Sequence, residues 1–113
     1  MILTVTFNPA IDHTYILEED IEKGSISRTE KSRFDAGGKG INVSTYLKSL
    51  GDETLATGPL GGFTGQFIRS ELDSQDLDHD FVEGGMTRIN TTITTHGEEY
   101  KVNHSGPELG QEV

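Results

Sequence analysis

Three glycines and a lysine come directly before a stretch of helical periodicity, in the segment DAGGKGIN. Gly37, Gly38 and Gly40 leave the main chain bare, so a ligand can approach their N–H groups closely. A helix N-terminus supplies unpaired donors and a partial positive charge, and Lys39 adds a full charge. This combination suits a bound anion or the hydroxyls of a sugar. The alternative is a tight turn that leaves Lys39 in solvent.

The side chain of Asn42 belongs to the same candidate site. Asn42 falls in the first turn of the expected helix, where its amide can both donate and accept hydrogen bonds. Two common nucleotide-binding motifs are excluded here. A P-loop needs Ser or Thr after its lysine, whereas Gly40 follows Lys39, and the glycine spacing does not match the dinucleotide fingerprint.

Composition narrows the classes of partner. The 113 residues include 19 acidic and 9 basic side chains, a net charge of −10, which argues against nucleic acid and an anionic membrane surface. Either an ordinary acidic protein or adaptation to high salt accounts for the acidity. The chain has no cysteine and its histidines lack metal-ligand spacing, so we expect no metal site. With neither a signal peptide nor an apolar run of roughly 20 residues, we expect a cytoplasmic protein.

The order of strand and helix signals predicts the fold class. Expected strands cover residues 2–7, as a core strand, then 55–58 and a short stretch from 81. One expected helix buries Val43, Tyr46, Leu47 and Leu50, and a second covers residues 64–73 with Thr64 as its cap. The segment GPLGGFTG between them is expected to be a loop. This β-α-β-α-β order predicts a parallel sheet with crossover helices.

Further strands are too polar for that sheet. Residues 11–17, 26–34 and 88–95 read as extended segments, and HGEE turns the last of them into a hairpin with residues 100–102. Buried parallel strands are almost continuously apolar. We therefore expect these strands to form a separate, half-exposed flap.

Four motifs occur in the same order as in the ribokinase-like PfkB sugar kinases: TVTFNPAID, GGKGINVSTYLKSLG, GGFTG and TRIN. Within that family the chain most resembles the 1-phosphofructokinases and tagatose-6-phosphate kinases. The resemblance implies a ribokinase-like α/β fold, a parallel sheet with helices on its faces and a β-strand lid over about residues 11–34 and 88–103. It covers essentially the whole chain but only the first third or so of a typical member. Residues 1–113 are therefore expected to be a truncated, N-terminal part of the kinase domain.

The resemblance also implies roles for single residues near the glycines. Asp12, in the NPAID motif, matches the carboxylate that closes over the sugar hydroxyls; a turn-capping aspartate is the alternative. Gly37, Gly38 and Asn42 match the residues that hold the sugar. Lys39 matches a lysine placed near the phosphosugar.

The TRIN motif implies the phosphate-binding residue. Arg88 matches the arginine that binds the existing phosphate of the substrate, a task that suits a planar, bidentate guanidinium. Asn90 lies two residues on and shares its face. From the strand pattern alone, Arg88 is only a charge at a strand start. No catalytic residue is expected in this chain, because the resemblance implies that the aspartate base and the nucleotide site lie beyond Val113.

The implied reaction transfers the γ-phosphoryl of ATP, with Mg²⁺, to fructose 1-phosphate and gives fructose 1,6-bisphosphate. Tagatose 6-phosphate and fructose 6-phosphate are the alternative phosphorylated ketohexoses. The fragment alone is expected to be inactive. Functions of another class stay open: a non-catalytic sugar-phosphate binder, or an assembly fragment that forms a homodimer through the lid strands.

Overall fold

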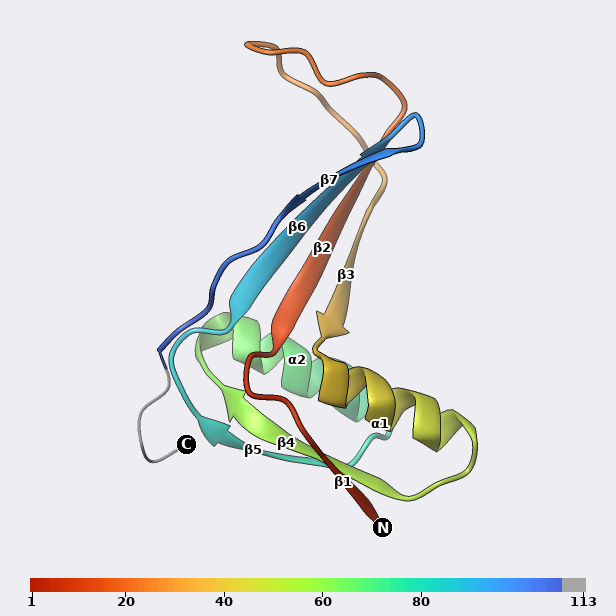
Figure 1. Cartoon of the computed structure of the whole chain (residues 1–113), viewed down its shortest axis with the longest axis vertical. Helices are drawn as coiled ribbons and strands as arrows, with labels where there is room; N and C mark the ends of the chain where they lie inside the picture. The colour runs from red at the N-terminus through yellow and green to blue at the C-terminus, as the bar shows by residue number, and fades with distance from the viewer. Residues whose placement is uncertain (109–113) are drawn as a thin grey trace.

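Two sheets and two helices make up residues 1–108, the part of the chain that the structure, a computed structural model, describes (Figure 1). The elements are β1 (Ile2–Val5), β2 (Ala10–Leu17), β3 (Ser32–Gly37), α1 (Lys39–Ser49), β4 (Thr54–Leu60), α2 (Gly62–Ser74), β5 (His79–Glu83), β6 (Arg88–Thr95) and β7 (Glu98–Val102). One sheet has the order β1-β4-β5, and the other, the lid, has the order β3-β2-β6-β7. The expected fold class, a parallel α/β sheet with a β-strand lid, is confirmed.

The three-stranded sheet is entirely parallel, and α1 and α2 lie on its lid side (Figure 1). Both helices serve as crossovers, as the β-α-β-α-β order predicts. The core fills the space between the sheet, the helices and the base of the lid. Its buried side chains are Ile11, Ile41, Ala56, Leu60, Ile68, Leu72, Leu77 and Phe81. Among the described residues, no helix has the length and apolar character needed to cross a membrane.

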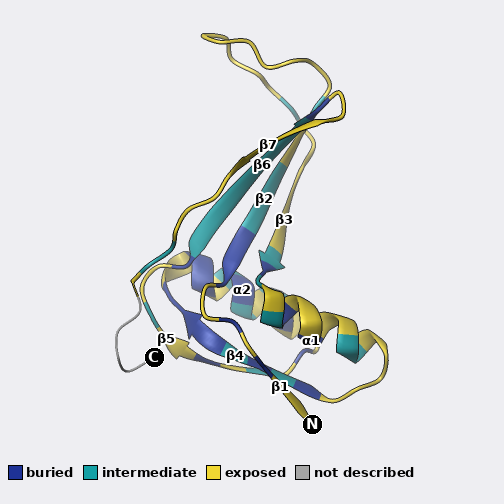
Figure 2. Ribbon diagram, in the orientation of Figure 1, coloured by how far each residue is buried: buried dark blue, intermediate teal, exposed yellow. Residues whose placement is uncertain are grey.

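The first strand differs from the expected core strand. β1 stops at Val5 and lies at the edge of the described sheet, with the side chain of Leu3 59% exposed and that of Val5 46% exposed. Of residues 1–7, only Thr4 and Thr6 are buried, because their side chains point toward α1. Residues 1–108 thus cover the helix face of the sheet and leave the other face of β1 exposed (Figure 2).

The predicted buried face of α1 is wrong except for Leu47, which is half-buried. Val43, Tyr46 and Leu50 are exposed, whereas Ile41 and Ser44 are fully buried. The reason is the closeness of α1 to β1, where the Ser44 hydroxyl lies 2.6 Å from the Thr4 hydroxyl. Small side chains permit that approach, so the larger apolar residues turn toward solvent (Figure 2).

The expected loop GPLGGFTG is also wrong. Its first half completes β4, and its second half forms the first turn of α2, whose N-cap is Gly61. Thr64 does not cap the helix. Its hydroxyl instead donates to the carbonyl of Thr87 at 2.7 Å and is fully buried there. This bond joins the start of α2 to the segment that enters the lid.

The lid is a separate sheet, as predicted, and β6 has the predicted limits. Its central pair, β2 and β6, is parallel, and β6 and β7 form a hairpin. His96 and Gly97 turn that hairpin with φ values of 46° and 80°, as in a type I′ turn. The expected strand over residues 26–34 is corrected: β3 begins only at Ser32 and continues to Gly37. β3 therefore leads directly into the glycine stretch.

A hydrogen bond in the lid hairpin changes the ionisation of one tyrosine. The Tyr100 hydroxyl donates to the Glu98 carboxylate at 2.9 Å. This bond and the negative charge of Glu98 raise the pKa of Tyr100 above its ordinary value, because both favour the protonated phenol.

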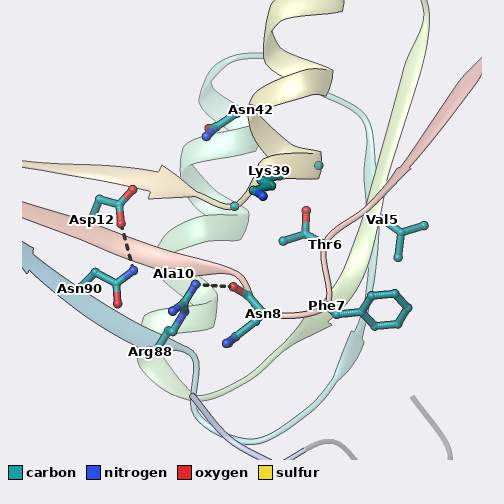
Figure 3. Close-up of a pocket in the computed structure, with 12 residues that line it drawn as sticks. Val5, Thr6, Phe7, Asn8, Ala10, Asp12, Lys39, Asn42, Arg88 and Asn90 are labelled. Carbon is teal, nitrogen blue, oxygen red and sulfur yellow. Dashed lines mark hydrogen bonds between the residues drawn. The ribbon is translucent and has the colours of Figure 1, made fainter. Parts of the chain in front are cut away.

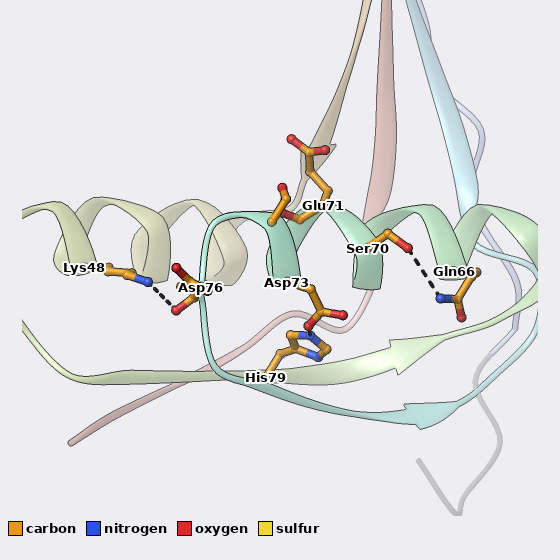
Figure 4. A network of polar contacts seen from close by, with 8 residues as sticks. Lys48, Gln66, Ser70, Glu71, Asp73, Asp76 and His79 are labelled. Carbon is orange, nitrogen blue, oxygen red and sulfur yellow. Dashed lines mark hydrogen bonds and ion pairs between the residues drawn. The ribbon is translucent and has the colours of Figure 1, made fainter.

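Polar contacts hold α1 against the C-terminal end of α2 (Figure 4). The Lys48 ammonium donates to the carbonyls of Gln75, at 2.7 Å, and Asp76. It thereby satisfies acceptors that every helix end leaves free and lies at the negative end of the helix dipole. On the sheet side, His79 Nε2 lies 2.7 Å from the Asp73 carboxylate (Figure 4).

We predict that Lys48→Met lowers the free energy of unfolding by about 1 kcal/mol, because carbonyls at the end of α2 lose a charged donor. Chemical denaturation measures the change. Lys23→Met is the matched control, since it removes the same charge from an exposed loop residue. Equal stability of the two variants would contradict the role of Lys48.

Candidate functional site

A cavity of about 460 Å³ opens where the lid meets the parallel sheet (Figure 3). Three parts of the chain line it: the end of β1 and the following loop, the start of α1, and the base of the lid. Of the seven residues predicted from the sequence, the lining includes Asp12, Gly38, Lys39, Asn42, Arg88 and Asn90. The structure thus brings together side chains that are up to 78 positions apart.

Two unpaired amides form one wall of the cavity. The N-cap of α1, Gly38, has φ 131° and offers no capping side chain. The Thr6 hydroxyl of the neighbouring loop accepts the Ile41 N–H at 3.0 Å in its place. Within residues 1–108, the N–H groups of Lys39 and Gly40 have no such acceptor. These two N–H groups are therefore free at the positive end of α1, where the sequence predicts a cradle of bare amides.

Gly37 lies outside the cavity lining and acts on Asp12. A Cβ on Gly37 would overlap the Asp12 carboxylate, so glycine at this position lets that side chain keep its place. On the other neighbouring strand, Asn90 is the register partner of Asp12, and its amide donates to the carboxylate at 3.5 Å (Figure 3). This contact orients the Asp12 carboxylate at the base of the lid, where it lines the cavity.

The guanidinium of Arg88 is held by carbonyl groups. It donates to the carbonyl of Asn8 and to that of His104, both at 3.1 Å. Its Nε is buried and has no partner among the described residues. Because these two carbonyl acceptors are uncharged, they do not neutralise the positive charge that Arg88 presents to the cavity.

The charge of the cavity is opposite to that of the protein. Among the described residues that line it, Lys39 and Arg88 are the two cations and Asp12 is the single acid, within a chain of net charge −10. A local excess of positive charge beside bare amides suits a ligand that carries both an anionic group and hydroxyls. Within residues 1–108, no three His, Cys, Asp or Glu side chains cluster so as to hold a metal ion.

Three residues of this region were missed by the sequence reasoning. Thr6 supplies the acceptor for α1, Asn8 holds Arg88, and His104 contacts both Arg88 and Asn90. The sequence signal for Thr6 is its alternation with Thr4, which continues the two-residue period of β1 into the following loop. Asn8 and His104 act mainly through main-chain groups, which leave no signal in the sequence.

A parallel sheet with crossover helices and a separate lid sheet, with a cavity where the two meet, defines the class of α/β proteins with a β-strand lid. The family model described as pfkB family carbohydrate kinase matches residues 5–111. The chain belongs to that family.

Individual relatives are similar over almost the whole chain. The 1-phosphofructokinase of Haloferax volcanii is 47% identical over 96% of this chain, and that of Borreliella burgdorferi is 42% identical over 98%. The structure of phosphofructokinase-2 from Escherichia coli in complex with fructose-6-phosphate superposes with a TM-score of 0.87 at 31% identity over 98% of this chain. This chain spans 36% of the length of each curated relative and 37% of that structure.

We predict that Thr6→Val lowers the free energy of unfolding by about 1–2 kcal/mol, because the Ile41 N–H loses its acceptor while keeping its buried position. Thermal or chemical denaturation measures this loss. Thr14→Val, the same change on a lid strand, is the control and should be near neutral. If both variants are equally stable, Thr6 does not support the start of α1.

Proposed function

We propose that this chain is the acceptor-binding part of an ATP-dependent kinase that converts fructose 1-phosphate to fructose 1,6-bisphosphate. The observation that carries the proposal is the single cavity that Asp12, Arg88 and the bare start of α1 share. Family membership and the names of the two curated relatives support the reaction. On this proposal, residues 1–113 are the N-terminal part of the kinase domain.

Each group of the cavity has a task in holding the acceptor. Asp12 accepts hydrogen bonds from sugar hydroxyls, and charge assistance makes such bonds short and strong. Arg88 binds the phosphate that the sugar already carries, and Lys39 adds a second cation. The amides of Lys39 and Gly40, together with the side chains of Asn42 and Asn90, hold the remaining sugar oxygens.

This part of the kinase contributes orientation and exclusion of water. Phosphoryl transfer depends mostly on positioning and on stabilisation of charge. The lid strands β2 and β6 carry Asp12 and Arg88, so closure of the lid brings these groups onto the sugar and removes water from the acceptor hydroxyl. The described residues contain no metal-binding cluster. We therefore assign Mg²⁺, ATP and the base to the longer part of the relatives that this chain does not span.

Other phosphorylated ketohexoses are the alternatives to fructose 1-phosphate as the acceptor substrate. Fructose 6-phosphate is the ligand named for the Escherichia coli structure, and tagatose 6-phosphate differs from it at one carbon centre. All of them present hydroxyls and one phosphate, and the same residues serve each. ATP and phosphosugars are compounds of the cytoplasm, so we place the kinase there.

We predict that the purified chain binds fructose 1-phosphate and that Arg88→Ala weakens the affinity at least about tenfold, since the phosphate loses a charged, bidentate partner. Titration calorimetry measures both affinities. Arg33→Ala is the matched control, because Arg33 lies on β3, pairs with Asp35 and does not line the cavity.

Two outcomes of this experiment would contradict the proposal. One is an absence of heat for fructose 1-phosphate, fructose 6-phosphate and tagatose 6-phosphate alike. The other is turnover of fructose 1-phosphate with Mg²⁺ and ATP by the 113-residue chain, which would refute its role as an acceptor-binding part alone.

An apolar lid face favours a second function, assembly into a homodimer. His13, Tyr15, Phe34 and Tyr100 share this face by strand register, and the His13 ring stacks on Phe34 with centroids 4.0 Å apart. Near α2 the face is covered, but Tyr15, Phe34 and Tyr100 are 36%, 50% and 49% exposed. A second lid of the same kind would bury these aromatic rings.

We predict that Tyr15→Glu weakens this dimer at least about tenfold, because a carboxylate would be buried against aromatic rings. Sedimentation measures the dissociation constant. Thr14→Glu is the control, since its side chain lies on the opposite face of the same strand. A wild-type chain that stays monomeric at all concentrations removes the assembly proposal.

A further inference from the structure

A short segment after the lid contacts both Arg88 and Asn90 through its main chain. The carbonyl of His104 accepts from Arg88 Nη1 at 3.1 Å, and the N–H of His104 donates to Asn90 Oδ1 at 3.2 Å. These two partners are the first and third residues of β6. One residue outside the lid strands thus bonds to two side chains that line the cavity. We call residues 104–106 the latch.

The latch is tied to the opposite wall of the cavity by Asn8. The amide of Asn8 donates to the carbonyl of Ser105 at 2.9 Å, and the carbonyl of Asn8 accepts from Arg88 Nη2 at 3.1 Å. The guanidinium is therefore held on two sides by carbonyls from segments that are 96 positions apart and bonded to each other. This closed arrangement restricts the rotation of the guanidinium.

A glycine is required for the latch to lie in this position. Gly106 has φ 87°, a conformation that side chains disfavour, and its N–H donates to His104 Nδ1 at 2.8 Å. A Cβ on Gly106 would overlap the carboxamide of Asn8. Beyond it, Pro107 packs so closely on Gly85 that no side chain fits there.

Holding an arginine by carbonyls has a particular consequence for binding an anion. A free arginine side chain loses rotamer freedom when a ligand fixes it. A group that is ordered before binding avoids that loss. Carbonyls order the guanidinium while leaving its charge uncompensated, whereas a carboxylate would neutralise it.

We propose that residues 104–106, anchored by Asn8, position Arg88 and Asn90 in advance for the phosphate and hydroxyl groups of the acceptor. Asn8 and Gly106 are positioning residues, because each acts through Arg88 or the latch. The proposal rests on the proposed function for its ligand, while the hold on Arg88 can be observed without any ligand.

The test compares Gly106→Ala with Gly24→Ala in the full chain. Gly24 has a similar φ of 81° and no atom within 4 Å of an added Cβ, so both variants carry similar backbone strain and only the first places a methyl group against the Asn8 carboxamide that ties the latch. We expect Gly106→Ala to bind fructose 1-phosphate roughly tenfold more weakly than Gly24→Ala, as judged by calorimetry. Asn8→Ala, which removes the amide tie and keeps the carbonyl, should show a similar loss.

Side-chain NMR of the Arg88 guanidinium supplies a readout that a purely structural role would not change. In the free protein we expect separate Nη signals for Arg88, because two carbonyls slow its rotation, and merged signals in Gly106→Ala and Asn8→Ala. Gly24→Ala should keep the separate signals. If Gly106→Ala does not fold, Asn8→Ala is compared with Gly24→Ala in both measurements.

The outcomes separate the two proposals. Equal affinities of the latch variants and Gly24→Ala for fructose 1-phosphate would overturn the latch and leave the proposed function standing. A wild-type chain that binds no phosphosugar, but whose Arg88 signals merge only in the latch variants, would overturn the proposed function and support the hold on Arg88. Merged Arg88 signals in the wild-type chain would overturn the latch whatever the ligand.

Discussion

The close contact between the end of the first strand and the start of α1 is the constraint on which the site depends. Thr6 accepts the Ile41 N–H, so α1 can begin at bare glycines without a capping side chain of its own. Gly40 is pressed against the Val5 main chain, where a larger residue would not fit. The same contact decides which side of α1 is buried. Small residues at the interface therefore serve both the packing of the helix and the exposure of its amides.

The lid is the second half of the site, and its register with the rest of the chain decides what faces the cavity. Asp12 and Asn90 are direct partners on parallel strands, and Gly37 on β3 leaves space for the carboxylate. Residues an odd number of positions from Asp12, such as His13 and Tyr15, point to the other face and form its aromatic surface. One sheet thus presents a polar face to the cavity and an apolar face to α2 and solvent.

The electrostatics of the site are local. Although the chain has a net charge of −10, Lys39, Arg88 and the N-terminus of α1 lie together with Asp12 around the cavity. Main-chain carbonyls hold the arginine without cancelling its charge. The relatives are almost three times as long as this chain. Under the proposed function, the cavity is one wall of the kinase site, and the donor side is assigned to the portion that this chain does not span.

Residue types and local order determined much of this protein. Alternation of strand and helix signals was sufficient for the parallel sheet, and polarity was sufficient to separate the lid, because both depend on neighbours in the chain. The glycines were recognisable from their place before a helix, whereas Asp12 and Arg88 became candidates only through the resemblance to the sugar kinases. Only the tertiary structure decided that Val43 and Tyr46 face solvent, since small polar residues let α1 approach β1. It alone placed Asn8 and His104 around Arg88, because main-chain groups are common to all residues and their partners lie far away in the sequence.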